Sequence, residues 1–144
     1  MQTRSISDGD LDALSDLYMR SFNAPPWNDS WTYESAKKRT SELLSHPRFV
    51  GFIALEGSAA SALAMGYLDS WTHGDQFRLV EMCVDPNRQR TGIGHQLLER
   101  LASALVHEGV SQICLEMRTD GPAENFFAQC DFTPLKLTSM IRRL

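Results

Sequence analysis

One run of residues, at the junction of an apolar stretch and a helix-like pattern, constrains this chain most: Val84-Asp85-Pro86-Asn87-Arg88-Gln89-Arg90-Thr91-Gly92-Ile93-Gly94-His95-Gln96-Leu97-Leu98. A basic loop with two glycines in this position presents backbone N–H groups and the positive end of a helix dipole to an anion. Gly92 and Gly94 lack a Cβ, so phosphate oxygens can approach the backbone closely. The run therefore predicts a binding site for a phosphorylated cofactor.

Three kinds of anion-binding loop compete for this run. A nucleotide P-loop carries Gly-Lys-Ser/Thr, whereas His95 follows Gly94 here. A dinucleotide fingerprint needs a small residue three positions after its second glycine, where this chain has Leu97. The remaining pattern, Gln/Arg-x-x-Gly-x-Gly/Ala, is met by residues 89–94. A strand-to-helix turn that binds nothing is the alternative, and the flanking arginines argue against it.

The composition favours one globular domain over residues 1–144, with 42% hydrophobic and 22% charged residues. A net charge of -4 argues against nucleic acid as a partner. No apolar run approaches the roughly 20 residues of a membrane span, and no Cys/His spacing predicts a metal site. The 3 cysteines are odd in number, so we expect free thiols and a cytoplasmic location.

The order of periodic segments predicts an α/β fold of the order β-α-α-β-β-β-α-β-α-β. A hairpin followed by a strand–helix–strand crossover implies a mixed sheet with helices on its faces. The expected helices are one capped at Ser7 or Asp8 and broken by residues 23–29, Trp31–Leu44, one from Ile93 that ends at Gly109, and Pro122–Gln129. The expected strands are Arg4–Ile6, Phe49–Leu55, Ala60–Leu68, Phe77–Val84, Gln112–Met117 and one within Leu137–Arg143.

The loop and this order of elements are similar to the GNAT superfamily, the GCN5-related N-acetyltransferases, in its small bacterial form. A second match lies in residues 120–132, where family members often carry Asn-x-x-Ala, an aromatic pair ending in Tyr, and Gly-Phe. Ala123, Phe126 and Phe132 agree with that pattern, whereas Phe127 stands where the tyrosine is common. The resemblance implies acetyl-CoA as the cofactor and direct attack by a primary amine in a ternary complex.

The resemblance also implies where the cofactor lies. The strand edge at Met82, Cys83 and Val84 is expected to pair with the pantetheine arm, and Phe127 to pack beside it without donating a proton. The pyrophosphate is expected on the N–H groups of the loop residues Gln89, Arg90, Thr91, Gly92, Ile93, Gly94 and His95.

Glu81 is the expected general base, because it interrupts an apolar strand just before the loop. An alkyl ammonium with a pKa near 10.4 leaves only about one amine in two thousand neutral at pH 7, so a base is useful. A solvent-facing charge is the alternative for Glu81. The backbone N–H of Cys83 is the expected donor to the oxyanion.

The segment between the first two expected helices is rich in aromatic residues and contains Pro25-Pro26. Trp27 and Trp31, with Glu34, are expected to surround a cationic acceptor, and packing against the core is the alternative for the tryptophans. The acceptor stays open between a small-molecule amine and a peptide amine, and a homodimer through the C-terminal strand is plausible.

Two other functions remain open. A non-catalytic acyl-CoA-binding sensor on the same fold is the alternative function, because Phe127 has no hydroxyl. An interaction module that keeps only the fold is a third class, against which the intact loop counts.

Overall fold

A five-stranded mixed sheet forms the centre of the computed structural model, which describes residues 1–144. The strand order is β1-β2-β3-β4-β5, with antiparallel pairing from β1 to β4 and parallel pairing between β4 and β5. The mixed α/β architecture that the sequence predicts is confirmed. The strands are β1 (Gln2–Ser5), β2 (Phe49–Glu56), β3 (Ala59–Trp71), β4 (Gly74–Val84) and β5 (Gln112–Cys114).

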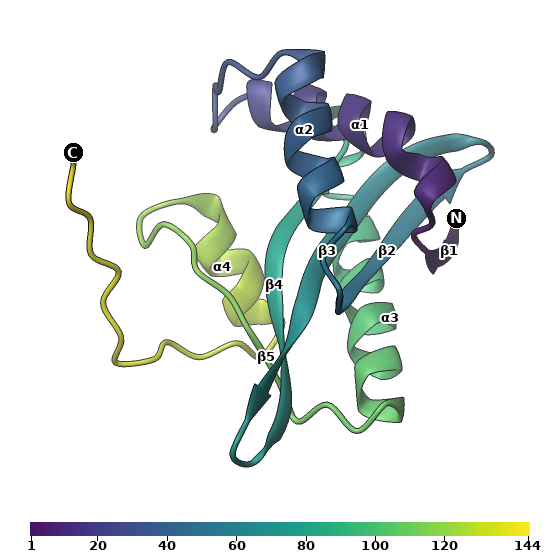
Figure 1. The fold of residues 1–144 in the computed structure, drawn as a ribbon. Coiled ribbons are helices and arrows are strands. Elements are labelled where there is room, and N and C mark those ends of the chain that lie inside the picture. Colours follow the sequence, from purple (N-terminus) through teal and green to yellow (C-terminus); the bar gives the residue numbers. More distant parts are fainter.

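Helices cover both faces of this sheet (Figure 1). Helices α1 (Leu11–Asn23) and α2 (Tyr33–Leu44) pack together on one face, and α3 (Ile93–His107) packs on the other. Helix α4 (Pro122–Gln129) adds its aromatic side chains to the α3 side. Two short 3-10 turns, η1 (Asp8–Asp10) and η2 (Pro86–Arg88), precede α1 and follow β4. No helix combines the length and the apolar character that a membrane crossing needs.

The helices form where apolar residues recur at helical spacing. In α1, the residues Leu14, Leu17 and Tyr18 are buried against the sheet. In α3, the buried stripe consists of Ile93, Leu97, Leu98, Leu101 and Leu105, as the sequence pattern predicts. Each face of the sheet therefore has its own apolar core, and β4 borders both.

Strand β4 contains a β-bulge. Met65 pairs with Glu81 but Gly66 pairs with Leu79, so Val80 is an extra residue. The strands approach so closely here that a Cβ on Gly66 would lie 1.9 Å from the carbonyl oxygen of Arg78. The bulge turns two consecutive side chains, Val80 and Glu81, toward the α1–α2 face, since Val80 packs in the core of that face and Glu81 bonds to both helices.

Strand β4 also separates from β5. The two strands pair only over Gln76–Arg78 and Gln112–Cys114, so β4 has a free edge from Leu79 onward. Because α3 begins at the end of β4, this free edge leads directly into the glycine-containing loop.

The C-terminal part of the chain differs from the sequence-based expectation. The expected strand within Leu137–Arg143 does not form, and residues 133–144 extend away from the body without secondary structure (Figure 1). A strand needs a neighbouring ladder, and the tail touches the body by a hydrogen bond from Ser139 to Glu116. The strand expected over Gln112–Met117 ends at Cys114 for the same reason.

Candidate active site

The loop between β4 and α3 is folded by its own short hydrogen bonds. Asp85 accepts the backbone N–H of Asn87 at 2.9 Å on its side chain and that of Arg88 at 2.8 Å on its carbonyl. The Thr91 hydroxyl donates to the Arg88 carbonyl at 2.5 Å. Gly92 then caps α3 at a φ of 84°, a left-handed conformation that favours glycine.

The backbone N–H groups of residues 89–95 donate no hydrogen bond within the chain. Those of Ile93, Gly94 and His95 belong to the first turn of α3, where no intrahelical acceptor exists. Arg88 and Arg90 are exposed beside them. The loop thus offers a row of unused donors, a helix dipole and two cations, which fit the pyrophosphate of coenzyme A.

Gly94 sits where the first turn of α3 meets β4 and α4. A Cβ at Gly94 would lie 3.2 Å from Val84 and 3.5 Å from the ring of Phe126. The first helical turn therefore packs directly against the end of β4, and a larger residue would push the loop away from the strand.

The backbone of β4 alternates between its two neighbours. The N–H of Asp85 donates to Ser61 at 2.8 Å, and the antiparallel register makes Cys83 face Leu63. By the alternation of such a ladder, the N–H of Cys83 also points to β3, whereas those of Met82 and Val84 point to the free edge. This alternation favours the N–H of Met82 over the expected N–H of Cys83 as a donor to the oxyanion, and it depends on the strand pairing, which the sequence does not show.

Glu81 projects from β4 toward α1 and α2. Only 12% of its side chain is exposed. Its Oε1 accepts the hydroxyl of Tyr18 at 3.1 Å, and Nε and Nη2 of Arg39 at 3.0 and 2.8 Å. No donor of the chain reaches Oε2. Glu81 is therefore held by one oxygen and has the other available, which excludes the alternative of a freely solvated charge.

Burial affects two neighbours of Glu81. It raises the pKa of the Cys83 thiol to about 12, so Cys83 is a protonated packing residue. Burial and the nearby charge of Glu81 raise the pKa of Tyr18 above its usual value. Tyr18 therefore stays a hydroxyl donor at neutral pH.

The aromatic segment before α2 packs onto α1. The Trp31 ring meets Tyr18 edge-on at 5.0 Å, and its backbone exchanges two 2.8 Å hydrogen bonds with the Asn23 side chain. Trp27 lies 5.9 Å from Phe22 and is 38% exposed, whereas Glu34 is exposed in the first turn of α2. Trp31 thus contacts Tyr18, the hydrogen-bond partner of Glu81, while Trp27 and Glu34 are more exposed.

A cleft of about 480 Å³ opens between α2 and β4. Trp27, Trp31 and Glu34 do not line it, so the expected acceptor residues and the cleft are separate. Its walls combine charged and apolar groups, namely Arg39, Glu42, Leu43, His46, Tyr67, Arg78, Leu79, Val80 and Glu116.

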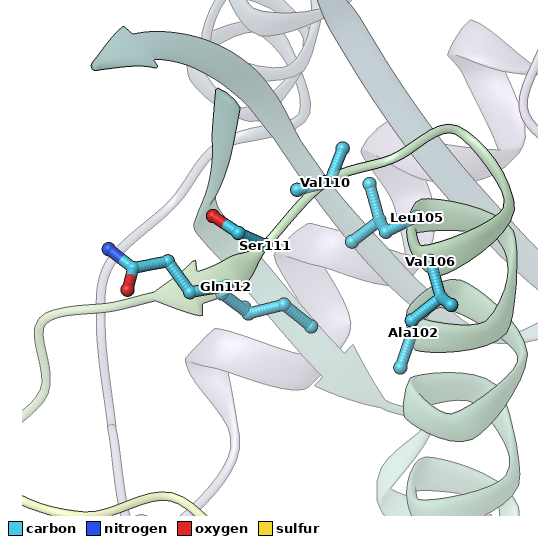
Figure 2. Close-up of a pocket in the computed structure, with 7 residues that line it drawn as sticks. Ala102, Leu105, Val106, Val110, Ser111 and Gln112 are labelled. Atoms are coloured by element: carbon cyan, nitrogen blue, oxygen red, sulfur yellow. The ribbon is translucent and has the colours of Figure 1, made fainter. Parts of the chain in front are cut away.

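A smaller, mostly apolar pocket of about 160 Å³ lies between the last turns of α3 and β5 (Figure 2). Leu105 and Val106 on α3 face Val110 and Ser111 across it. At about 1.5 Å per helical residue, this pocket is most of the length of α3 away from Gly92. It therefore takes no part in the site around the loop.

Phe127 lies on α4 in an aromatic cluster. Its ring is edge-on to Phe126 at 5.0 Å and to Phe132 at 5.3 Å, and it packs against the α3-side core. One helical turn later, Cys130 places its Sγ 3.3 Å from Nδ1 of His95. The first turns of α3 and the end of α4 are thus in contact beside the loop.

Sequence reasoning missed Tyr18 and Arg39 as partners of Glu81. Tyr18 matched the apolar stripe of α1, and Arg39 matched the polar face of α2. The available signal was Glu81 itself, because a carboxylate in an apolar strand needs donors from whatever packs on that face.

Comparisons with known proteins agree with this geometry. Residues 47–134 match the family model described as the acetyltransferase (GNAT) domain. The [ribosomal protein bS18]-alanine N-acetyltransferase of Escherichia coli (strain K12) is 29% identical over 119 residues, which are 83% of this chain and 71% of that protein.

Two solved structures share the fold. A possible acetyltransferase from Clostridium difficile 630 has a TM-score of 0.84 at 14% identity, over 99% of this chain and 97% of that one. An aminoglycoside N-acetyltransferase in complex with CoA has a TM-score of 0.76 at 14% identity, over 99% and 93%. The family model covers more than half of the chain, and the chain therefore belongs to the GNAT family as an acyl-CoA-dependent N-acetyltransferase.

Proposed function

We propose that this protein transfers an acetyl group from acetyl-CoA to a primary amine within a ternary complex. The observation that carries the proposal is the row of unused N–H groups at residues 89–95, directly after the free edge of β4. Such a row suits a pyrophosphate, and a strand edge suits the amide groups of pantetheine.

The donor side of the proposal uses one continuous stretch of chain. The loop residues 89–95 hold the pyrophosphate, with charge from Arg88 and Arg90. Met82 and Val84 offer backbone groups to the pantetheine arm, because the N–H groups of these two residues point to the free edge of β4. Phe127 supplies an apolar wall beside that arm.

The chemical step needs a base and an oxyanion donor. Glu81 takes the proton of the ammonium at Oε2, and the neutral amine attacks the acetyl carbonyl. The N–H of Met82 replaces that of Cys83 as the oxyanion donor, since it points to the edge where the acetyl group lies. The C–S bond then breaks and releases the CoA thiolate.

No tyrosine stands at position 127 to protonate the thiolate. With a thiol pKa near 8.5, release as thiolate at pH 7 costs only about 2 kcal/mol relative to release as the thiol. Solvent can then deliver the proton, so the reaction does not require an acid at Phe127.

The acceptor enters through the 480 Å³ cleft, whose walls include the bulge at Val80 and the Arg39 partner of Glu81. Trp27, Trp31 and Glu34 form an outer rim that meets the more distant parts of the acceptor. The similar protein from Escherichia coli is named for an alanine of ribosomal protein bS18 and the structural neighbour for aminoglycosides, so both a peptide amine and a small-molecule amine are candidates.

The decisive experiment measures thiol release from acetyl-CoA against a panel with an alanine-initiated peptide, an aminoglycoside and a polyamine. We expect turnover with at least one amine and loss of most turnover in Glu81→Gln. Thermal stabilisation by CoA without turnover on any amine would instead support the non-catalytic sensor. Normal turnover in Glu81→Gln across pH would remove Glu81 from the mechanism.

The exposed C-terminal tail bears on how the protein associates. The C-terminal tail exposes Leu137, Met140 and Ile141, and we propose that it pairs with a second copy in a homodimer. Light scattering on the full chain and on a chain that ends at residue 134 tests this, since only the full chain should dimerise.

The free thiols favour a reducing compartment, so we propose that the protein is cytoplasmic.

A further inference from the structure

Three donors converge on one oxygen of Glu81. The hydroxyl of Tyr18 and two nitrogens of Arg39 all bond to Oε1, at 3.1, 3.0 and 2.8 Å. Oε2 accepts no hydrogen bond from the chain. A carboxylate with free rotation would share its donors between both oxygens, so this arrangement fixes the plane of the group and separates the functions of its two atoms.

The donors themselves are held in different ways. Tyr18 is buried between Phe22, at 4.7 Å, and Trp31, at 5.0 Å, so its hydroxyl cannot swing away from Glu81. Arg39 has 43% of its side chain exposed and lines the acceptor cleft. One donor is therefore rigid and the other is open to solvent, salt and acceptor.

We propose that Tyr18 and Arg39 are positioning residues that hold Oε1 of Glu81 and so present Oε2 to the ammonium of the acceptor. This inference rests on the proposed function of Glu81 as the base. Tyr18 sets the orientation of the carboxylate, and Arg39 supplies two further donors that keep Oε1 occupied. Neither residue touches the reacting atoms.

The pair also links the acceptor segment to the base. Trp31 packs on Tyr18, and Tyr18 bonds to Glu81. A change at Trp31 is therefore expected to alter the rate through Tyr18 even though Trp31 lies outside the cleft.

The test compares kcat and KM for Arg39→Gln, Arg39→Lys and Tyr18→Phe. In Arg39→Gln, kcat should fall roughly tenfold with little change in KM, because two of the three donors to Oε1 are lost. Arg39→Lys should recover part of kcat. Tyr18→Phe should lower kcat roughly three- to tenfold with little change in KM, since one hydrogen bond to a charged group is lost.

Matched controls exist for both changes. Tyr33→Phe removes a similar hydroxyl–carboxylate bond, 2.7 Å to Asp12, and Arg48→Gln removes an arginine of similar exposure from its ion pair with Asp75. Both controls should keep the wild-type kcat. Thermal stabilisation by CoA confirms that each variant is folded and binds its cofactor.

The salt dependence of the unaltered protein tests the role of Arg39 without a substitution that could affect folding. Raising the salt from about 0.05 M to about 1 M screens the half-exposed Arg39 charge and should lower kcat at saturating acetyl-CoA, as Arg39→Gln does. Unchanged kcat in Arg39→Gln, in Tyr18→Phe and in high salt would overturn the inference. Normal activity of Glu81→Gln would instead overturn the proposed base, which is a separate result.

Discussion

Glu81 and Cys83 lie two positions apart on the same face of β4, but their surroundings give them opposite chemical character. Cys83 is buried in the apolar core under α1, with the Ser21 side chain as a polar neighbour. Glu81 lies where α1 and α2 supply a hydroxyl and a guanidinium. The thiol is thus kept neutral and inert, while the carboxylate is held by hydrogen bonds next to Arg39, which lines the cleft.

This difference predicts a ranking of the 3 cysteines toward thiol reagents. Cys83 should stay unlabelled by iodoacetamide at about pH 8, because burial raises its pKa to about 12, whereas Cys114 and Cys130 are partly exposed. Peptide mapping after labelling checks this, and labelling in urea should recover Cys83. Rapid labelling of native Cys83 would show that the α1–sheet core opens.

At the level of elements, the bulge in β4 decides which face Glu81 occupies. Counting in twos from Leu79, which packs under α3, would place Glu81 on the α3 face. The extra residue, Val80, moves Glu81 to the α1–α2 face, next to Arg39. The location of the proposed base therefore depends on a single inserted residue and on the close approach of β3 that Gly66 allows.

We expect Gly66→Ala to be strongly destabilising. Its Cβ would lie 1.9 Å from the Arg78 carbonyl, so the strands must separate, at a cost of about 2–4 kcal/mol. That cost should lower Tm by roughly 10 °C. Gly9→Ala is the control, because nothing lies within 4 Å of its new Cβ. Equal Tm values for the two variants would contradict the close packing at the bulge.

The elements also show how far the sequence can be read. Helix α3 and the loop before it were predictable, because a stripe from Ile93 to Leu105 and the glycines at 92 and 94 are local signals. The bulge and the direction of the Cys83 N–H depend on the partner strand β3. The Tyr18–Glu81–Arg39 cluster joins residues far apart in the chain, so only the folded arrangement reveals it.

For the whole molecule, stability at low pH depends on the junction of β1 with η1. Arg4 makes two 2.8 Å hydrogen bonds to Asp10, and these bonds lower the pKa of Asp10 to about 2. A carboxyl whose pKa is lower in the folded than in the unfolded state, about 3.9, stabilises the fold above pH 4. That contribution is lost as the pH falls from about 4 to about 2.

Asp10→Asn should therefore be less stable than the wild type at pH 7, and the difference should shrink between about pH 4 and pH 2. Urea unfolding at a series of pH values measures both curves. Asp8→Asn serves as the control, since Asp8 is exposed and bonds to no arginine. A constant difference between Asp10→Asn and wild type over this range would show that the Arg4 pair does not govern acid stability.

The separation of β4 from β5 after Arg78 leaves the sheet with an unfilled position. If pantetheine lies along that edge, the ligand becomes a temporary strand, and the sheet is complete only while a donor is bound. The amides of Met82 and Val84 should then exchange hydrogen with solvent quickly in the free protein and slowly with CoA, while that of Cys83, bonded to β3, stays protected in both. The exchange rates of the Met82 and Val84 amides would thus report whether CoA is bound. The free enzyme would be the form in which this strand edge is less protected from exchange.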